Sequence, residues 1–145
     1  MNEIARTKEW FQLAVAQPTE KNKLVQLGVH IEEIGEMFTA LDAGALATAL
    51  NELATAFKVG ATPAGDPIAF SDFTVNRKEL LDALCDQIVT TVGVAHMLDM
   101  DILTALARVN DSNWSKFVDG KPVFDENGKI KKGPSYQKPN LDGLY

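Results

Sequence analysis

Residues 20–42 most constrain the fold, because their large apolar side chains recur every three or four positions. This spacing places those side chains along one stripe of an α-helix. Pro18 ends the segment before it, and Thr19 is suited to cap its first turn. The stripe consists of Leu24, Leu27, Ile31, Ile34, Phe38 and Leu41. A helix with one apolar stripe needs a packing partner, so the pattern predicts a helical bundle.

The rest of the chain reads as more helices followed by an irregular end. Helices are predicted over residues 2–16, 45–57, 76–98 and 101–117. The end contains two turn-like segments, a small hairpin that pairs Val123-Phe124 with Ile130-Lys131, and an extended arm. We therefore expect an all-α four- to five-helix bundle. Its single domain would comprise a helical part, 1–117, and a C-terminal arm, 118–145.

Composition excludes several classes of function. The chain has 145 residues and a net charge of -6. Nucleic acid and anionic membranes both select basic surfaces, so neither is an expected partner. The single cysteine, Cys85, permits no internal disulfide, and no apolar run approaches the length of a membrane span. These features predict a cytoplasmic protein.

Three carboxylates, Glu32, Glu33 and Glu36, stand within five residues of the first long helix. Their spacing puts them on one side of that helix, roughly opposite its apolar stripe. No Lys or Arg lies nearby in the sequence to offset their repulsion. Two unit charges about 4 Å apart repel by roughly 1 kcal/mol in water and by roughly 4 kcal/mol at an effective dielectric of about 20. The cluster is therefore either a solvated face or half of a cation site.

A second acidic cluster, Glu79, Asp82 and Asp86, lies on one side of the fourth predicted helix. The same side continues into the apolar residues Val89 and Met97, which makes this helix apolar nearly all round. Such a helix is expected to be buried. Carboxylates that face each other from two helices form an all-oxygen site of the kind that Mg²⁺ prefers. The two clusters therefore predict a magnesium site that could bind a phosphorylated substrate.

These motifs resemble a known family. Glu32-Glu33-x-x-Glu36, followed by Asp82-Ala83-Leu84-Cys85-Asp86, looks like the EExxE and ExxD motifs of all-α nucleoside triphosphate pyrophosphohydrolases. That group includes MazG-like enzymes, dimeric dUTPases, dCTP pyrophosphatases and phosphoribosyl-ATP pyrophosphohydrolase. The resemblance covers about residues 5–117. The tail looks like the C-terminal extension of small stand-alone members, often found in phages and bacteria.

The resemblance implies a metal site and a reaction. Mg²⁺, or Mn²⁺ as a substitute, would be held by Glu33, Glu36 and Asp86, together with Asp82 or Glu79. The family's usual Glu is replaced here by Ala83, which leaves the number of metal ions open. The expected reaction is cleavage of a (d)NTP to (d)NMP and pyrophosphate, in nucleotide-pool control or house-cleaning.

The resemblance also implies roles for other residues and an oligomeric state. Glu32 would be either a further metal ligand or the base for the attacking water. Asn113 and Lys116 would contact phosphate or sugar, and the tail residues Lys131, Lys132 and Tyr136 would close over the substrate. Relatives assemble as homodimers or homotetramers, so the same is expected here.

Two alternative functions stay open. The first is a non-catalytic helical module that senses nucleotides or binds a host protein, an interpretation that Ala83 favours. The second is phosphoribosyl-ATP hydrolysis, which keeps the chemistry but changes the substrate. The two acidic motifs do not indicate which base or sugar of the nucleotide is preferred.

Overall fold

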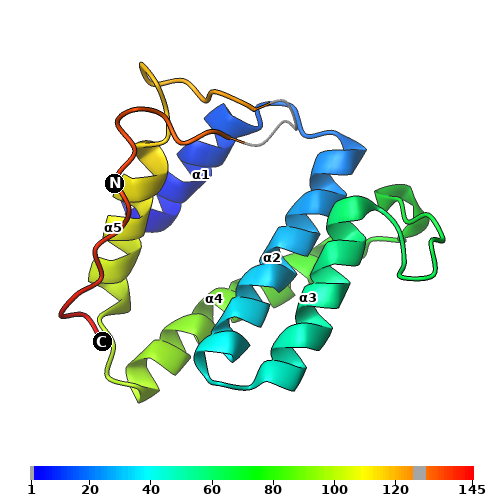
Figure 1. The fold of residues 1–145 in the computed structure, drawn as a ribbon, viewed down its shortest axis with the longest axis horizontal. Helices are drawn as coiled ribbons and strands as arrows, with labels where there is room; N and C mark the ends of the chain where they lie inside the picture. The colour runs from blue at the N-terminus through cyan, green and yellow to red at the C-terminus, as the bar shows by residue number, and fades with distance from the viewer. Residues whose placement is uncertain (1, 126–129) are drawn as a thin grey trace. The chain divides into compact units, whose positions relative to one another are not determined.

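The computed structural model describes residues 2–125 and 130–145, and it confirms the all-α prediction (Figure 1). The described helices are α1 (Glu3–Ala14), α2 (Glu20–Ala40), α3 (Gly44–Val59), the short 3₁₀ helix η1 (Phe70–Asp72), α4 (Arg77–Met97) and α5 (Ile102–Trp114). The predicted helices all exist, with small differences at their ends. The largest is in α5, which ends at Trp114 instead of residue 117.

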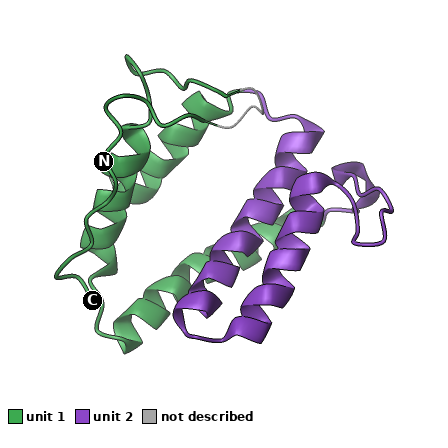
Figure 2. Cartoon of the chain, viewed as in Figure 1, with its two compact units in different colours: residues 1–16, 76–145 green, residues 17–75 purple. Residues whose placement is uncertain are grey.

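The chain divides into two compact units, coloured separately in Figure 2. Unit 1 comprises Met1–Ala16 and Asn76–Tyr145, and unit 2 comprises Gln17–Val75. Unit 1 thus combines the tail with α1, α4 and α5, and unit 2 contains the α2–α3 hairpin.

Unit 2 is built on the antiparallel pair α2 and α3, which lie side by side (Figure 1). Thr19 caps α2 as predicted: its hydroxyl accepts the Asn22 amide, and the Asn22 side chain accepts the Thr19 amide in return. The contact between the helices is lined by small buried residues, including Gly28, Gly35 and Ala54. Small side chains let two helix backbones approach closely.

Aromatic side chains anchor the loop that follows α3. The Phe57 and Phe73 rings stack with their centroids 5.9 Å apart, and Phe70 lies 6.5 Å from Phe73. A single antiparallel bridge between Ala61 and Pro67 closes the loop's first half. These ring contacts tie the loop to the end of α3.

Unit 1 is held together by contacts between α1 and α5. Asn110 is almost completely buried, and its side-chain amide donates to the Glu3 carbonyl at 3.0 Å and to the Glu3 carboxylate at 2.7 Å. The Thr7 hydroxyl donates to the Asn110 side-chain oxygen at 2.9 Å. Beyond this network, the Trp10 ring stacks on the buried Phe117 ring, with the ring centroids 5.6 Å apart.

The C-terminal arm returns along α5. The Arg108 guanidinium donates to the Asn140 carbonyl at 2.8 Å, and the Asp101 amide donates to the Leu144 carbonyl at 2.9 Å. The predicted hairpin is present as one bridge, between Phe124 and Ile130. Residues 126–129 of its predicted turn lie outside the described residues.

The turn between α4 and α5 places Asp99 in the left-handed region, with φ of 57°. Aspartate tolerates this conformation better than most residues. In the described part of the chain, no single helix is long and apolar enough to cross a membrane. Only α4 and α5 taken together reach that length and composition, and they are bent by 119°.

Candidate functional site

The α2 carboxylates are the first half of the predicted site. Glu32, Glu33 and Glu36 lie on consecutive turns of α2, well inside its ends. Glu33 and Glu36 are exposed, whereas Glu32 is half-buried where α2 meets α3. The predicted cluster is therefore divided, because one of its members turns toward the neighbouring helix.

Lys58, in the last turn of α3, is the partner of Glu32. Its Nζ donates to Glu32 Oε1 at 2.6 Å. The side chains are 31% and 37% exposed, so this ion pair lies at the edge of the helix contact. The sequence places no Lys or Arg near the cluster, and the fold supplies one from another helix. The compensating charge comes from a residue 26 positions away in the sequence.

Gly28 makes room for this lysine. A Cβ atom at Gly28 would lie 2.7 Å from Lys58 Cγ and 2.7 Å from the Ala54 carbonyl oxygen. One turn beyond Glu32, a Cβ atom at Gly35 would lie 2.7 Å from Asn51 Oδ1. All three distances are shorter than real Cβ atoms show, but Asn51 Oδ1 ends a side chain that can move, whereas the Ala54 carbonyl is backbone. Gly28 therefore limits the register in which α3 presents Lys58 to Glu32.

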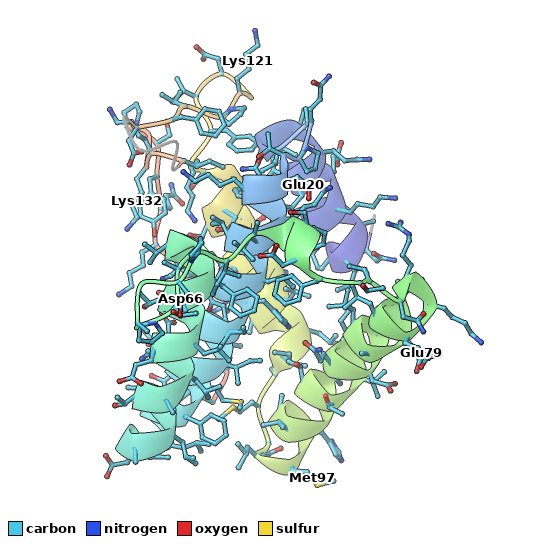
Figure 3. All side chains as sticks on the ribbon, turned by 90° about the vertical axis from the view of Figure 1, so that its right-hand side faces the viewer. Glu20, Asp66, Glu79, Met97, Lys121 and Lys132 are labelled. Atoms are coloured by element: carbon cyan, nitrogen blue, oxygen red, sulfur yellow. The ribbon has the colours of Figure 1, made fainter. Side chains whose placement is uncertain are left out.

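The α4 carboxylates form the predicted second half. Asn76 caps α4 by accepting the Glu79 amide at 3.3 Å, and Figure 3 shows Glu79 projecting outward from this helix. Glu79, Asp82 and Asp86 are all exposed. Ala83, which replaces the family's usual Glu, is exposed beside them.

The prediction that α4 is buried is wrong for this chain on its own. Leu81, Ile88 and Val89 are 64%, 50% and 67% exposed, and among the described residues of α4 only Ala95 is fully buried. Among the described helices of unit 1, α4 contacts only α5, so most of its length has no helical neighbour in its own unit. Its apolar residues are therefore available for a further contact.

Asn113 and Lys116 are brought together at the end of α5. Lys116 Nζ donates to the Asn113 side-chain oxygen at 2.7 Å, and the Asn113 carbonyl accepts from Trp10 Nε1 at 3.0 Å. Both side chains are half-buried. The predicted substrate-binding pair therefore has a fixed geometry, held by the aromatic residues that join α1 to α5.

The predicted tail residues are exposed or partly exposed. The Lys132 ammonium lies 4.8 Å from the centre of the Tyr136 ring, within the range of a cation–π contact. The Lys131 amide donates to the Val123 carbonyl at 2.7 Å, which orders this part of the tail. Nearby, the Gln137 amide donates to the Ser115 hydroxyl, so the arm is tied to the end of α5.

The donor chemistry of the predicted ligands fits magnesium, because all of them are carboxylates. In the part of the chain that the structure describes, no three His, Cys, Asp or Glu side chains gather closely enough to hold an ion. Glu33 and Glu36 belong to unit 2, whereas Glu79, Asp82 and Asp86 belong to unit 1. Each unit thus carries part of the predicted ligand set.

Unit 2 also contains two cavities. The larger, of about 630 Å³, runs along α3 beside the loop that follows it, with Thr48, Asn51 and Thr55 in its wall. The smaller, of about 290 Å³, includes Lys58 and Phe70. None of the residues predicted for the site lines either cavity.

Sequence reasoning missed Lys58 and the buried Asn110, but a signal for the first exists. In an antiparallel helical hairpin, residues equally far from the turn lie opposite each other. Gly28 and Lys58 each lie 15 positions from Ala43, and Gly35 and Asn51 each lie 8 positions from it. The glycine spacing of α2 thus pointed to the α3 residues that it contacts.

No protein-family model, curated protein or solved structure matches this chain. The family resemblance therefore rests on the motifs alone.

Proposed function

We propose that this chain is a Mg²⁺-dependent nucleoside triphosphate pyrophosphohydrolase that cleaves a (d)NTP to the (d)NMP and pyrophosphate. The observation that carries the proposal is the division of the α2 cluster. Glu33 and Glu36 are exposed on adjacent turns, while Glu32 is held beside them by Lys58. An EExxE segment whose members differ in this way suits a site that needs both metal ligands and an oriented carboxylate.

The carboxylates have separate roles in this proposal. Glu33, Glu36 and Asp86 would hold the metal, with Asp82 or Glu79 in place of the glutamate that Ala83 replaces. Magnesium neutralises phosphate charge and lowers the pKa of a bound water. Glu32 either adds a ligand or accepts the proton of the water that attacks the α-phosphorus.

The end of α5 and the tail would bind the substrate. The Lys116 ammonium supplies a cation for phosphate, and Asn113 fixes its position through the 2.7 Å hydrogen bond. Lys131, Lys132 and Tyr136 add two cations and an aromatic ring, groups that suit phosphates and a base or sugar. These contacts would fix the triphosphate without reading the base.

A homodimer or homotetramer belongs to the proposal. The exposed apolar residues of α4, among them Leu81, Ile88 and Val89, support it. Contiguous apolar surface on a soluble protein commonly marks an interaction site. Burial of α4 between copies would also move its carboxylates into a site shielded from water.

The test is a panel of NTPs and dNTPs with Mg²⁺, with released pyrophosphate and orthophosphate measured separately. Pyrophosphate is expected as the primary product. The Asp86→Asn variant should lose turnover, because the amide keeps the size of the side chain but not its charge, and its circular dichroism should be unchanged. Orthophosphate as the primary product, or full activity of this variant, would contradict the proposal.

A second candidate is a non-catalytic helical module that binds a nucleotide or a host protein. Ala83 favours it, because the chain has one carboxylate fewer than the usual motif provides. This alternative predicts saturable nucleotide binding without any turnover. The same panel, run with equilibrium binding alongside product release, separates the two.

A further inference from the structure

The last turn of α5 is completed by a hydrogen bond from another helix. The last four carbonyl groups of a helix have no partner within it. Three of those in α5 accept donors from residues 115–117, just beyond the helix. The Asn113 carbonyl accepts the Lys116 amide at 3.2 Å and also the indole N–H of Trp10 at 3.0 Å. Trp10 belongs to α1, so α1 fixes the turn that follows α5.

The Trp10 ring is itself held in place by aromatic neighbours. It stacks on the buried Phe117 ring at an interplanar angle of 15° and contacts Phe11 edge to face, with centroids 5.1 Å apart. Trp114 also packs on Phe117, with centroids 5.5 Å apart. Its Nε1 is buried and, in the part of the chain that the structure describes, has no hydrogen-bond partner. The two tryptophans thus share a packing partner but differ in the bonding of the indole N–H.

The turn fixed by Trp10 carries an ammonium group whose partner is neutral. Lys116 Nζ donates to Asn113 Oδ1 at 2.7 Å, so Asn113 holds both the backbone and the side chain of this lysine. An amide carries no net charge and leaves the charge of Lys116 uncompensated. By contrast, Lys23 and Lys58 each pair with a glutamate. The Lys116 ammonium is therefore suited to bind an anion such as phosphate.

The C-terminal arm brings a second cation of this kind to the same turn. A Cβ atom at Gly133 would lie 3.2 Å from the Lys116 carbonyl oxygen, so the arm crosses directly against the turn. The preceding residue, Lys132, holds its ammonium 4.8 Å from the centre of the neutral Tyr136 ring. All of these groups belong to unit 1. The arrangement therefore suits a multiply charged anion without any contribution from the carboxylates of α2.

We propose that Trp10 is the positioning residue of a phosphate site at the end of α5, where Lys116 binds the polyphosphate of the substrate without a metal ion. The inference rests on the proposed function, which assigns Asn113 and Lys116 to the substrate, and it adds the residue that holds them. The indole N–H keeps the turn closed and so determines where the Lys116 ammonium lies. Trp10 acts through Lys116 and does not contact phosphate.

The test is isothermal titration calorimetry of the full chain with inorganic triphosphate and no divalent cation. Lys116→Gln removes a charge-assisted hydrogen bond and should weaken triphosphate binding about tenfold or more. Trp10→Phe keeps a stacking ring and removes the N–H, and it should weaken binding about three- to tenfold, the range for one hydrogen bond. In the Lys116→Gln background, Trp10→Phe should have no further effect, because it acts through Lys116.

Two control variants separate positioning from a structural role. Trp114→Phe makes the same substitution beside the same Phe117 ring, but it removes an N–H without a described partner. It should change triphosphate binding by less than about twofold. Lys78→Gln removes an exposed lysine from the first turn of α4 and should weaken binding far less than Lys116→Gln. Circular dichroism of each variant checks that the helices are kept.

The outcomes distinguish this inference from the proposed function. If Trp10→Phe binds triphosphate no more weakly than Trp114→Phe, or weakens binding equally in the Lys116→Gln background, Trp10 does not position Lys116 and the inference fails. The inference also fails if Lys78→Gln and Lys116→Gln have equal effects, or if the wild-type chain binds no triphosphate without a metal ion. In each case the release of pyrophosphate with Mg²⁺ decides the proposed function separately.

Discussion

At the scale of single residues, glycines decide how closely α2 and α3 approach. Gly28 is buried against the Ala54 carbonyl and the Lys58 stem, at distances that leave no room for a methyl group. Gly44, at the start of α3, has no neighbour within 4 Å of its would-be Cβ. The two positions therefore differ in packing although the residue is the same.

Gly28→Ala is expected to destabilise the chain by about 1–3 kcal/mol, the usual cost of overpacking. Gly44→Ala is the matched control and should change stability by no more than about 1 kcal/mol, in the stabilising direction, because alanine favours helix. Urea unfolding followed by circular dichroism measures both. Equal effects at the two positions would contradict the close contact between α2 and α3.

Asp101 predicts a pH dependence at the N-terminus of α5. Its carboxylate accepts the Thr104 hydroxyl at 2.6 Å and the Thr104 amide at 3.0 Å, and these hydrogen bonds lower the pKa of Asp101 below its ordinary value. A lowered folded-state pKa stabilises the fold above the ordinary pKa of aspartate. That contribution is lost as the pH falls through this value and then through the lower folded one.

Asp101→Ala should therefore lower the melting temperature at neutral pH, and the difference from wild type should shrink in acid. Asp101→Asn keeps a capping oxygen without the charge, so its melting temperature should lie closer to wild type and depend less on pH. Thermal scans from neutral to acidic pH check this. A difference that stays constant with pH would show that the charge of Asp101 makes no contribution.

At the scale of elements, α1 and α5 are joined by a buried polar contact as well as by aromatic packing. Asn110 bonds to Glu3 and Thr7, and it is 3% exposed. Next to it, the exposed Asp111 pairs with Arg6 at 2.7 Å. Removing a polar contact lowers the free energy of unfolding more when it leaves buried polar groups without hydrogen-bond partners than when the groups are exposed to water.

Asn110→Ala should destabilise the chain by about 1–3 kcal/mol, because it leaves buried donors and acceptors unpaired. Asp111→Asn, one residue on, removes only an exposed ion pair and should cost no more than about 1 kcal/mol. Denaturant unfolding compares the two directly. If Asp111→Asn lowered the free energy of unfolding more than Asn110→Ala, the Arg6–Asp111 ion pair would contribute more to this contact than Asn110.

Helix type and order follow from local periodicity, which is why the sequence predicted them. The stripe from Leu24 to Leu41 and the Thr19 cap both depend on neighbours in the chain. Lys58 was missed because its partner Glu32 lies on another helix, and only the register of the hairpin joins them. The exposure of α4 was missed because periodicity reports which residues are apolar and not what covers them.

At the scale of the whole molecule, α4 is the surface on which we expect a second copy to pack. Its exposed apolar residues, such as Val89 at 67%, and the outward Met97 in Figure 3 at 83%, favour association with a second copy. Val59, at the end of α3 in unit 2, is similarly exposed, at 69%. The two valines thus form a matched pair.

The full chain is expected to sediment as a dimer or tetramer, and Val89→Glu should shift it toward monomer because a charge would be buried. Val59→Glu should leave the sedimentation coefficient unchanged. Sedimentation velocity over a range of concentrations measures both. A monomeric wild-type chain, or equal effects of the two substitutions, would contradict assembly through α4.

Isotope labelling shows whether the proposed hydrolysis falls between the α- and β-phosphates. The wild-type chain is incubated with Mg²⁺ and its best nucleoside triphosphate in ¹⁸O-labelled water, and the products are analysed by mass spectrometry. Attack of water on the α-phosphorus should leave one ¹⁸O atom in the nucleoside monophosphate and none in the pyrophosphate. Label in pyrophosphate or in orthophosphate, or no labelled product with any triphosphate, would contradict it.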